Sequence, residues 1–258
     1  MIRYDEKEAR ATDRAYLTPD IVRQRMATLE ALQLRAGDRV LDVGCGTGLL
    51  AYDMGQLVGK AGEVLGIDLS EDMLRHAQGR CDGLPQVRFA QGNCTALAAS
   101  DGYFDAVVCT QVLLYVADLE TALAEFRRVM KPGGRLVVIE TDWRGAVLNS
   151  SDDSLTRRIL AAWDGAMASP NLPPTLSPRL SAAGFVALRV EAVPILNTSF
   201  NAGNFSHNMA KGFARYAERH DAVTKAESDA WLADLERLAD EKAYFFCVNR
   251  FLFSGVKG

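Results

Sequence analysis

The sequence is poor in the residues that build metal sites and disulfide frameworks. Its 258 residues include three histidines and five cysteines, and no two cysteines form a Cys-x-x-Cys pair. An odd number of cysteines without such a pair argues against a disulfide framework and against a structural zinc site. We therefore expect no metal site and a reducing, cytoplasmic setting.

Long apolar runs and a strong charge of one sign are also lacking. No stretch approaches the roughly 18 apolar residues that a membrane span requires, and the charged segment Met1–Glu8 lacks the apolar core of a signal peptide. The formal net charge is −4 and the basic residues are scattered, which disfavours a nucleic-acid partner. We expect an intracellular protein without stable membrane insertion, acting as a monomer or homodimer.

What is present is the composition of an ordinary globular protein, with 48% hydrophobic and 24% charged residues. The length suits one large α/β domain, or one domain with an insertion. Strand-like segments alternate with helical ones, which predicts a doubly wound, parallel α/β sheet. Strands are expected at 39–43, 63–68, 87–90, 104–109, 135–140, 185–193 and 244–253, and helices at 49–57, from 70, at 119–130 and at 225–238.

Two parts are expected along the chain. Residues 1–36 form an N-terminal helical cap, and residues 37–258 form a Rossmann-like domain. Within that domain we expect a helical and loop insertion at about 143–178, which ends in a proline-rich loop before a short helix at 180–184. The polar segment at about 195–222 is a natural lid.

The most informative stretch is Val40-Leu41-Asp42-Val43-Gly44-Cys45-Gly46-Thr47-Gly48, followed by Ile67-Asp68. An apolar strand runs into a glycine-rich turn, and a second strand ends in a carboxylate 20 residues beyond the last glycine (68 − 48 = 20). Glycines let backbone approach a ligand, and the acid can accept hydrogen bonds from ribose hydroxyls. The pattern is therefore typical of an α/β sheet that holds an adenosine-bearing cofactor.

Spacing separates this turn from the dinucleotide fingerprint. Its glycines follow a G-x-G-x-G pattern with Leu49 next, whereas dinucleotide folds use G-x-G-x-x-G. Together with the Ser70-x-x-Met73-Leu74 pattern, the turn resembles that of the class I S-adenosylmethionine-dependent methyltransferases, in the ubiquinone and menaquinone biosynthesis branch. The resemblance covers residues 38–141 by motif and 180–254 by element order.

The resemblance implies a seven-stranded, mainly parallel sheet of order 3-2-1-4-5-7-6 with an antiparallel strand 7. The cofactor would be S-adenosyl-L-methionine, with S-adenosyl-L-homocysteine as product. Gly44 and Gly46 resemble the glycines whose backbone lies against the methionine part, and Asp42 the acid that orients its ammonium group. Asp68 matches the ribose-binding acid, with Leu69 beside it.

Three further segments correspond to the adenine end of the family's site and to its mouth. Met73 stands where the family places a side chain on the adenine face, which suits a soft thioether. Gly92-Asn93-Cys94 replaces the usual Gly-Asp-Ala. Asn93 can still accept from the adenine amine through its amide oxygen, and the Cys94 amide can bond a ring nitrogen. Gln111 is expected to face the cofactor or the substrate mouth.

Transfer of an activated methyl group needs alignment and exclusion of water more than a strong base. Asp142 or His207 is expected to orient the acceptor. Trp143 and the insertion's leucines suggest an apolar pocket. The acceptor would then be small and partly hydrophobic: a quinone, a polyketide or another secondary metabolite. A nicotinamide-dependent oxidoreductase and a non-catalytic cofactor-binding subunit are the alternatives.

Overall fold

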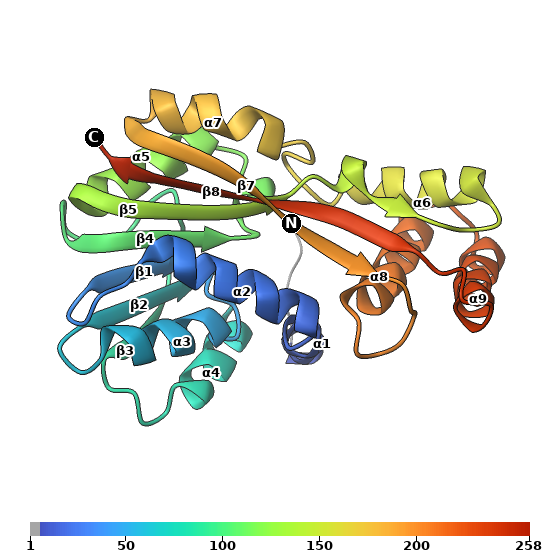
Figure 1. Cartoon of the computed structure of the whole chain (residues 1–258), viewed down its shortest axis with the longest axis horizontal. Coiled ribbons are helices and arrows are strands. Elements are labelled where there is room, and N and C mark those ends of the chain that lie inside the picture. The colour runs from blue at the N-terminus through green and yellow to red at the C-terminus, as the bar shows by residue number, and fades with distance from the viewer. Residues whose placement is uncertain (1–5) are drawn as a thin grey trace.

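The computed structural model describes residues 6–258, and its centre is a mixed sheet. In those residues the strand order is β3-β2-β1-β4-β5-β8, with β7 on the other edge of β8 (Figure 1). The strands are β1 (Arg39–Val43), β2 (Glu63–Asp68), β3 (Val87–Gln91), β4 (Phe104–Thr110), β5 (Met130–Thr141), β6 (Val147–Leu148), β7 (Phe185–Asn197) and β8 (Phe246–Lys257).

The expected strand order is confirmed, with β7 and β8 as the expected sixth and seventh strands. Strands β1 to β5 pair in parallel, and β8 is antiparallel to both β5 and β7. The described sheet has an eighth strand, β6, that we did not expect. β8 pairs with β5 as far as Arg250↔Thr141, and β6 then continues the same edge at Cys247↔Val147. The short strand therefore supplies hydrogen-bond partners where β8 has run past β5.

Helices cover both faces of the sheet because side chains of the central strands alternate between two cores. Val108 belongs to one cluster, with buried residues of α2 (Pro19–Leu32) and α3 (Leu49–Val58). Val107 belongs to the other, with buried residues of α5 (Leu119–Val129) and α7 (Pro173–Ala182). This two-residue period is that of a strand buried on both faces. α4 (Glu71–Arg80) packs against β2 and β3.

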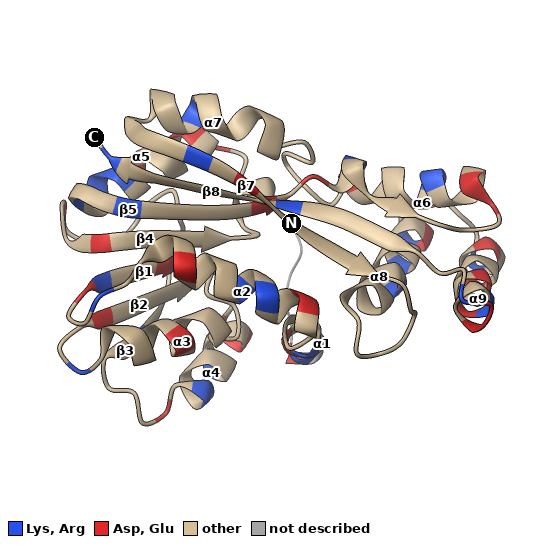
Figure 2. Cartoon of the chain, in the orientation of Figure 1, with Lys and Arg blue, Asp and Glu red and all other residues tan. Residues whose placement is uncertain are grey.

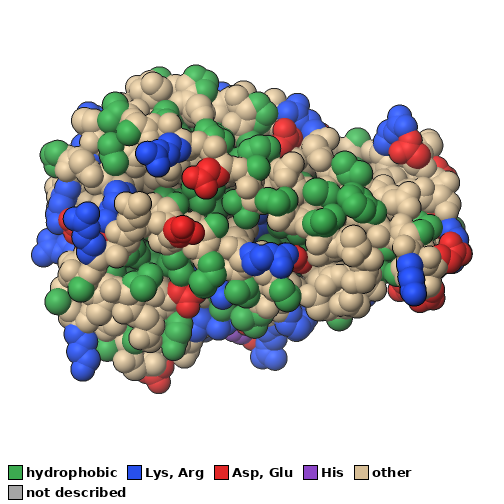
Figure 3. All heavy atoms as spheres, viewed as in Figure 1, with side chains coloured by type: hydrophobic (Ala, Val, Ile, Leu, Met, Phe, Trp, Pro, Cys, Tyr) green, Lys and Arg blue, Asp and Glu red, His purple; other side chains and the backbone are tan. Residues whose placement is uncertain are grey.

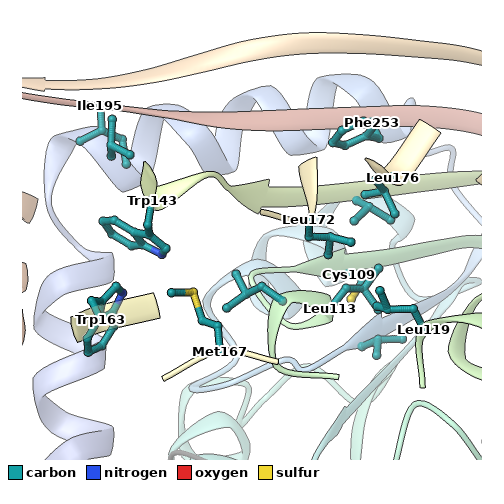
Figure 4. Packing of buried hydrophobic residues seen from close by; sticks show 14 of the residues in the cluster. Cys109, Leu113, Leu119, Trp143, Trp163, Met167, Leu172, Leu176, Ile195 and Phe253 are labelled. Carbon is teal, nitrogen blue, oxygen red and sulfur yellow. The ribbon is translucent and has the colours of Figure 1, made fainter. Parts of the chain in front are cut away.

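β7 and β8 continue beyond the other strands and carry a helical arm, seen at the right of Figure 1. We define the arm as β6, the outer ends of β7 and β8, and the helices α6 (Asp153–Asp164), α8 (Phe205–Arg219) and α9 (Lys225–Asp240). Trp143 joins the arm to the sheet, since its ring stacks on Phe205 and meets Trp163 edge-on at 6.3 Å. Figure 4 shows Met167 between this aromatic group and the core around Leu113.

Two local expectations need correction. The helix expected at 180–184 begins at Pro173, because prolines occupy the first helical positions, where no backbone N–H is required. The polar segment at about 195–222, for which no regular period was recognised at its start, contains α8, a helix of 15 residues. Its polar start concealed the apolar spacing of Phe205, Ala210, Phe213, Ala214 and Ala217, all of which are buried.

The two N-terminal helices have different positions. α2 packs against β5, β7 and β8 and so belongs to the layered fold, whereas α1 (Glu6–Tyr16) contacts α2, α4 and α8. Residues 1–5 of the expected cap lie outside the described part of the chain.

α8 takes its N-terminal cap from distant segments. Asn204, the residue before the helix, makes no side-chain cap. Instead the carboxylate of Asp20 in α2 accepts from the Phe205 N–H at 3.4 Å, and the amide oxygen of Asn197 in β7 accepts from the Ser206 N–H at 3.0 Å. Asn197 also donates to Asp20 at 2.8 Å. All four residues are buried, so these bonds fix the arm to the N-terminal part of the fold.

We expect Asp20→Ala to lower the free energy of unfolding by about 1–3 kcal/mol, because buried amide groups at the start of α8 lose an acceptor. Thermal unfolding followed by circular dichroism should show a fall in Tm of roughly 2–12 °C. Asp229→Ala is the matched control, since Asp229 pairs only with Lys225 on an exposed helix face and should cost under about 0.5 kcal/mol. Equal Tm values for the two variants would contradict the cap.

Candidate cofactor site

The turn between β1 and α3 is built from three glycines in the left-handed region. Gly44, Gly46 and Gly48 have φ values of 71°, 53° and 77°. The N–H groups of Gly44 and Cys45 both donate to the carbonyl of Ile67, at 2.8 and 2.9 Å. The turn is therefore fastened to the carboxyl end of β2, the edge at which parallel α/β sheets bind ligands.

Gly44 and Gly46 have different surroundings. A Cβ at Gly44 would lie 2.2 Å from Cγ2 of Val112, so close packing as well as conformation requires glycine there. A Cβ at Gly46 would meet no atom of the described residues within 4 Å. Gly46 therefore presents bare backbone to open space, which a ligand can approach closely.

Asp68 links the turn to the next helix. One carboxylate oxygen accepts from the Gly46 N–H at 3.0 Å and the other accepts from the Ser70 N–H at 2.9 Å. Burial raises the pKa of this carboxyl above its usual range, against the lowering effect of these backbone bonds. Each oxygen keeps a further lone pair for a hydroxyl donor, so the acid suits a diol such as a ribose.

Asp42 is the buried acid of the site. Its side chain lies at the end of β1, the residue is only 2% exposed, and Oδ2 has no partner in the described structure. Burial, together with the negative charge of Asp68, raises the pKa of Asp42 to about 7. A buried carboxylate oxygen without a partner is costly, and an ammonium group would satisfy both its charge and its lone pairs. This orphaned oxygen fits the amino group that the family's cofactor carries.

The expected adenine-side residues follow β2 and β3 at the same edge. Met73 is buried in the first turn of α4, which Ser70 caps by accepting from the Met73 N–H at 3.3 Å. Leu69 is 55% exposed beside Asp68. Asn93 is exposed and its Oδ1 accepts from the Thr95 N–H at 3.1 Å, while the next residue, Cys94, is buried. Bonding between Asn93 and an adenine amine would use the second lone pair of that oxygen.

Gln111 is held against β5. Its Nε2 donates to the carbonyl of Ile139 at 3.1 Å and its Oε1 accepts from the Thr141 hydroxyl at 2.6 Å. The residue has a positive φ of 58°, a costly conformation for a side chain other than glycine. These bonds give Gln111 a local role in joining the ends of β4 and β5.

Asp142 and His207 were expected to orient the acceptor. In the described structure no hydrogen bond links either of them to the glycine turn. Asp142 caps the short helix η2 (Trp143–Gly145) through the Arg144 N–H at 3.2 Å. The ring of His207 packs on Phe200 within the arm, at 4.8 Å between centroids. Burial, and then Lys211, lower the pKa of His207.

The sequence reasoning missed the bonds that hold α1 over the glycine turn. Asp13 accepts from the Thr47 hydroxyl at 2.7 Å and from Arg80 at 2.6 Å, and Arg80 also donates to the Thr47 carbonyl at 2.9 Å. α1 is thereby attached both to the turn and to α4. Asp13 is one of many charged residues near the start of the sequence, so no local pattern marks it.

The described residues do not indicate a metal site, a membrane-spanning helix or a surface of one charge. Among residues 6–258 no three His, Cys, Asp or Glu side chains gather in a way that could hold a metal ion, and no helix is both long and apolar enough to cross a membrane. Acidic and basic residues are interspersed along the helices (Figure 2), and on the face drawn in Figure 3 they are likewise mixed.

The glycine turn offers a direct test of this geometry. Gly44→Ala should lower the free energy of unfolding by about 3 kcal/mol or more, because strain at positive φ adds to a clash with Val112. Gly46→Ala, with strain but no clash, should cost about 1 kcal/mol. The corresponding falls in Tm are roughly 6–12 °C and 2–4 °C. A larger fall for Gly46→Ala than for Gly44→Ala would show that the turn is built differently.

Known proteins resemble the part of the chain that contains this site. A family model described as a methyltransferase domain matches residues 40–134. The demethylmenaquinone methyltransferase of Lactococcus lactis is 40% identical over 119 residues, which are 45% of this chain and 47% of that protein. The ubiquinone/menaquinone C-methyltransferase UbiE of Francisella tularensis is 40% identical over 118 residues, 44% of this chain and 46% of that protein. The chain thus spans about half the length of these relatives.

Among solved structures, the [4+2]-cyclase SpnF is 27% identical with a TM-score of 0.61, over 91% of this chain and 80% of that one. The matched residues 40–134 include the glycine turn, Asp68, Met73 and Asn93. Residues 40–134 therefore carry a methyltransferase domain that is similar to the corresponding part of the ubiquinone and menaquinone C-methyltransferases.

Proposed function

We propose that this protein transfers a methyl group from S-adenosylmethionine to a small, partly hydrophobic acceptor. The observation that carries the proposal is the open backbone at Gly46 between two acids, Asp42 with an orphaned oxygen and Asp68 with spare lone pairs. These three features would suit three parts of one ligand. Asp42 would bind an amino group, the open backbone at Gly46 would lie against a linker, and Asp68 would bind a ribose diol. An amino-acid nucleoside has that order of groups.

The chain's own residues bind and orient. Asp42 holds the ammonium group, the backbone at Gly44 and Gly46 lies against the methionine chain, and Asp68 accepts from the ribose. Met73 and Asn93 bound the adenine. When bound, S-adenosylmethionine supplies a methyl carbon that the acceptor attacks in line, while the sulfur keeps the electron pair of the broken bond. The protein's part is alignment and exclusion of water.

We infer that the acceptor binds near the place where the arm meets the sheet. Trp143, Trp163 and Phe205 are buried there, with ring centroids 6.3 and 6.4 Å from that of Trp143. Aromatic walls suit a quinone, a polyketide or a similar ring-containing metabolite. Relatives named as demethylmenaquinone and ubiquinone/menaquinone methyltransferases favour the quinone class. The action of Asp142 and His207 on the acceptor stays a prediction.

The alternatives differ in their ligands and products. A nicotinamide-dependent oxidoreductase is disfavoured by the G-x-G-x-G spacing and by the antiparallel β8. A cofactor-binding protein that transfers no methyl group has one observation in its favour, since the similar SpnF structure is titled a cyclase.

Calorimetric titration with S-adenosylmethionine, S-adenosylhomocysteine and NAD should show micromolar binding of the two sulfur nucleosides alone. We expect Asp68→Asn to weaken that binding about tenfold or more, because one strong acceptor is lost. The matched control is Asp229→Asn, on the exposed face of α9. Binding of NAD alone would overturn the proposal. Binding without methyl transfer to any quinol or phenol acceptor would favour the cofactor-binding alternative.

Asp42 gives the binding a pH dependence. Its pKa of about 7 lies above the ordinary value of 3.8, so the folded protein retains a proton that the unfolded chain loses. Stability from this group is therefore full below about pH 4 and is lost as pH rises through about 7. An ammonium group prefers the ionised carboxylate, so S-adenosylhomocysteine should bind more tightly at about pH 8 than at about pH 6, with proton release.

Calorimetry in buffers of different ionisation enthalpy measures that proton release. Asp42→Asn should abolish both the release and the rise in affinity between these pH values, while Asp68→Asn should keep them. Equal proton release by wild type and Asp42→Asn would assign the titration to another group.

A further inference from the structure

Glu140, at the end of β5, is a buried acid with no place among the groups that would hold the cofactor. Its side chain is fully buried, and Oε2 has no partner among the described residues. Burial raises the pKa of Glu140 to about 8, against the lowering effect of bonds from backbone N–H groups. A buried acid of this kind is costly to the fold, so stability alone does not account for it.

The other oxygen of Glu140 holds the segment that follows β4. Oε1 accepts from the backbone N–H groups of Val112 and Leu113, at 3.1 and 2.7 Å. These residues begin the short helix η1 (Leu113–Tyr115), and the side chain of Val112 makes no cap bond there. The first N–H groups of a helix have no partner within it. The carboxylate of Glu140 therefore caps this segment from a neighbouring strand.

The two residues that flank Glu140 on β5 fasten the start of the same segment. The backbone N–H of Gln111 donates to the carbonyl of Ile139 at 2.8 Å. The Gln111 side chain donates to that carbonyl at 3.1 Å and accepts from the Thr141 hydroxyl at 2.6 Å. A positive φ, here 58° at Gln111, persists only where the surroundings fix it. Three consecutive residues of β5 thus hold the chain from 111 to 113.

This held segment places Val112 on the glycine turn. A Cβ built at Gly44 would lie 2.2 Å from Cγ2 of Val112, 3.4 Å from its Cβ and 3.5 Å from its Cγ1. The Val112 side chain therefore lies directly against the backbone of Gly44. Since Gly44 has no side chain to fill a gap, any displacement of Val112 changes the packing of the turn.

We propose that Glu140 is a positioning residue for the amino-acid end of the cofactor, acting through Val112. Under the proposed function, on which this inference rests, the methionine chain lies against the backbone at Gly44. By holding Val112 in place, Glu140 keeps that backbone in the position that receives the methionine chain. Glu140 itself touches neither the cofactor nor the acceptor.

The adenosine end of the site is held by other contacts. Asp68 accepts from the N–H groups of Gly46 and Ser70, and Asn93 accepts from that of Thr95. In the described structure no hydrogen bond joins Asp68 or Asn93 to residues 111–113. Loss of the Glu140 bonds should therefore affect the amino-acid end of the ligand and spare its nucleoside.

Two ligands that differ at the amino-acid end test this inference. S-adenosylhomocysteine carries the amino acid, whereas 5′-methylthioadenosine has the same nucleoside and sulfur without it. We expect Glu140→Ala to weaken binding of S-adenosylhomocysteine about tenfold or more, while the affinity for 5′-methylthioadenosine changes less than about twofold. Titration calorimetry of the full-length protein measures both affinities.

Two further variants separate positioning from general damage. Glu140→Gln keeps an oxygen that accepts from both N–H groups, so S-adenosylhomocysteine should bind within about threefold of the wild-type affinity. Val112→Ala keeps the backbone bonds to Glu140 but shortens the side chain on Gly44, so it should weaken binding of S-adenosylhomocysteine alone. The effects of Glu140→Ala and Val112→Ala should not add in the double variant, because one residue acts through the other.

Amide hydrogen exchange supplies a readout in the protein without ligand. The N–H groups of Val112 and Leu113 should exchange slowly in wild type and in Glu140→Gln, and faster in Glu140→Ala, which removes their acceptor. Unchanged exchange in Glu140→Ala would show that the carboxylate does not hold the segment.

Asp105→Ala is the matched control. Asp105 accepts from the Arg39 N–H at 2.9 Å, at the amino end of β4 and so at the edge of the sheet opposite the glycine turn. This variant loses a comparable carboxylate bond to backbone, so it should lower Tm and leave both affinities unchanged.

Equal weakening of both ligands by Glu140→Ala, or S-adenosylhomocysteine binding unaffected by Glu140→Ala and Val112→Ala, would overturn the inference. If Glu140→Ala fails to fold, Val112→Ala decides the matter, because it leaves the bonds to Glu140 in place. Failure of wild type to bind S-adenosylhomocysteine would instead overturn the proposed function.

Discussion

The pairing of β8 with two strands at once is the constraint on which the rest of the structure depends. β8 is antiparallel to β5 on one edge and to β7 on the other, and its first residues pair with β6 after β5 has ended. One strand thus completes the sheet and supports the arm. It also places Arg250 opposite Thr141, at the carboxyl end of β5, where its guanidinium donates to Gln24 of α2.

Two buried acids near the glycine turn make the folded chain less stable than it would be without them. Asp42 and Glu140 are buried acids whose pKa values rise to about 7 and about 8, and each has one carboxylate oxygen without a partner in the part of the chain that the structure describes. Such groups reduce the stability of the folded chain near neutral pH. A ligand that supplies an ammonium group to Asp42 would remove the cost at that position, so stability and binding are coupled there.

The sheet order and the cofactor turn could be predicted because both leave local marks in the sequence. Apolar runs such as Val107-Val108 indicate buried strands, and glycines at 44, 46 and 48 indicate a turn with positive φ. Contacts between distant segments leave no such mark. Nothing near Asp13, Asp20 or Arg250 in the sequence shows that their partners lie in the glycine turn, α8 and α2. The start of α8 was missed for the same reason, since its cap is not adjacent in sequence.

That distant cap has a consequence for the order in which the protein acquires its structure. Asp20 and the Phe205 N–H are 185 positions apart, and Asp20 and Asn197 are 177 apart. Contacts this far apart in sequence close large loops and form slowly. The first turn of α8 lacks a local cap, so an isolated peptide spanning 197–220 would begin its helix poorly. We therefore expect the arm to reach its final order only once α2 has docked on the sheet.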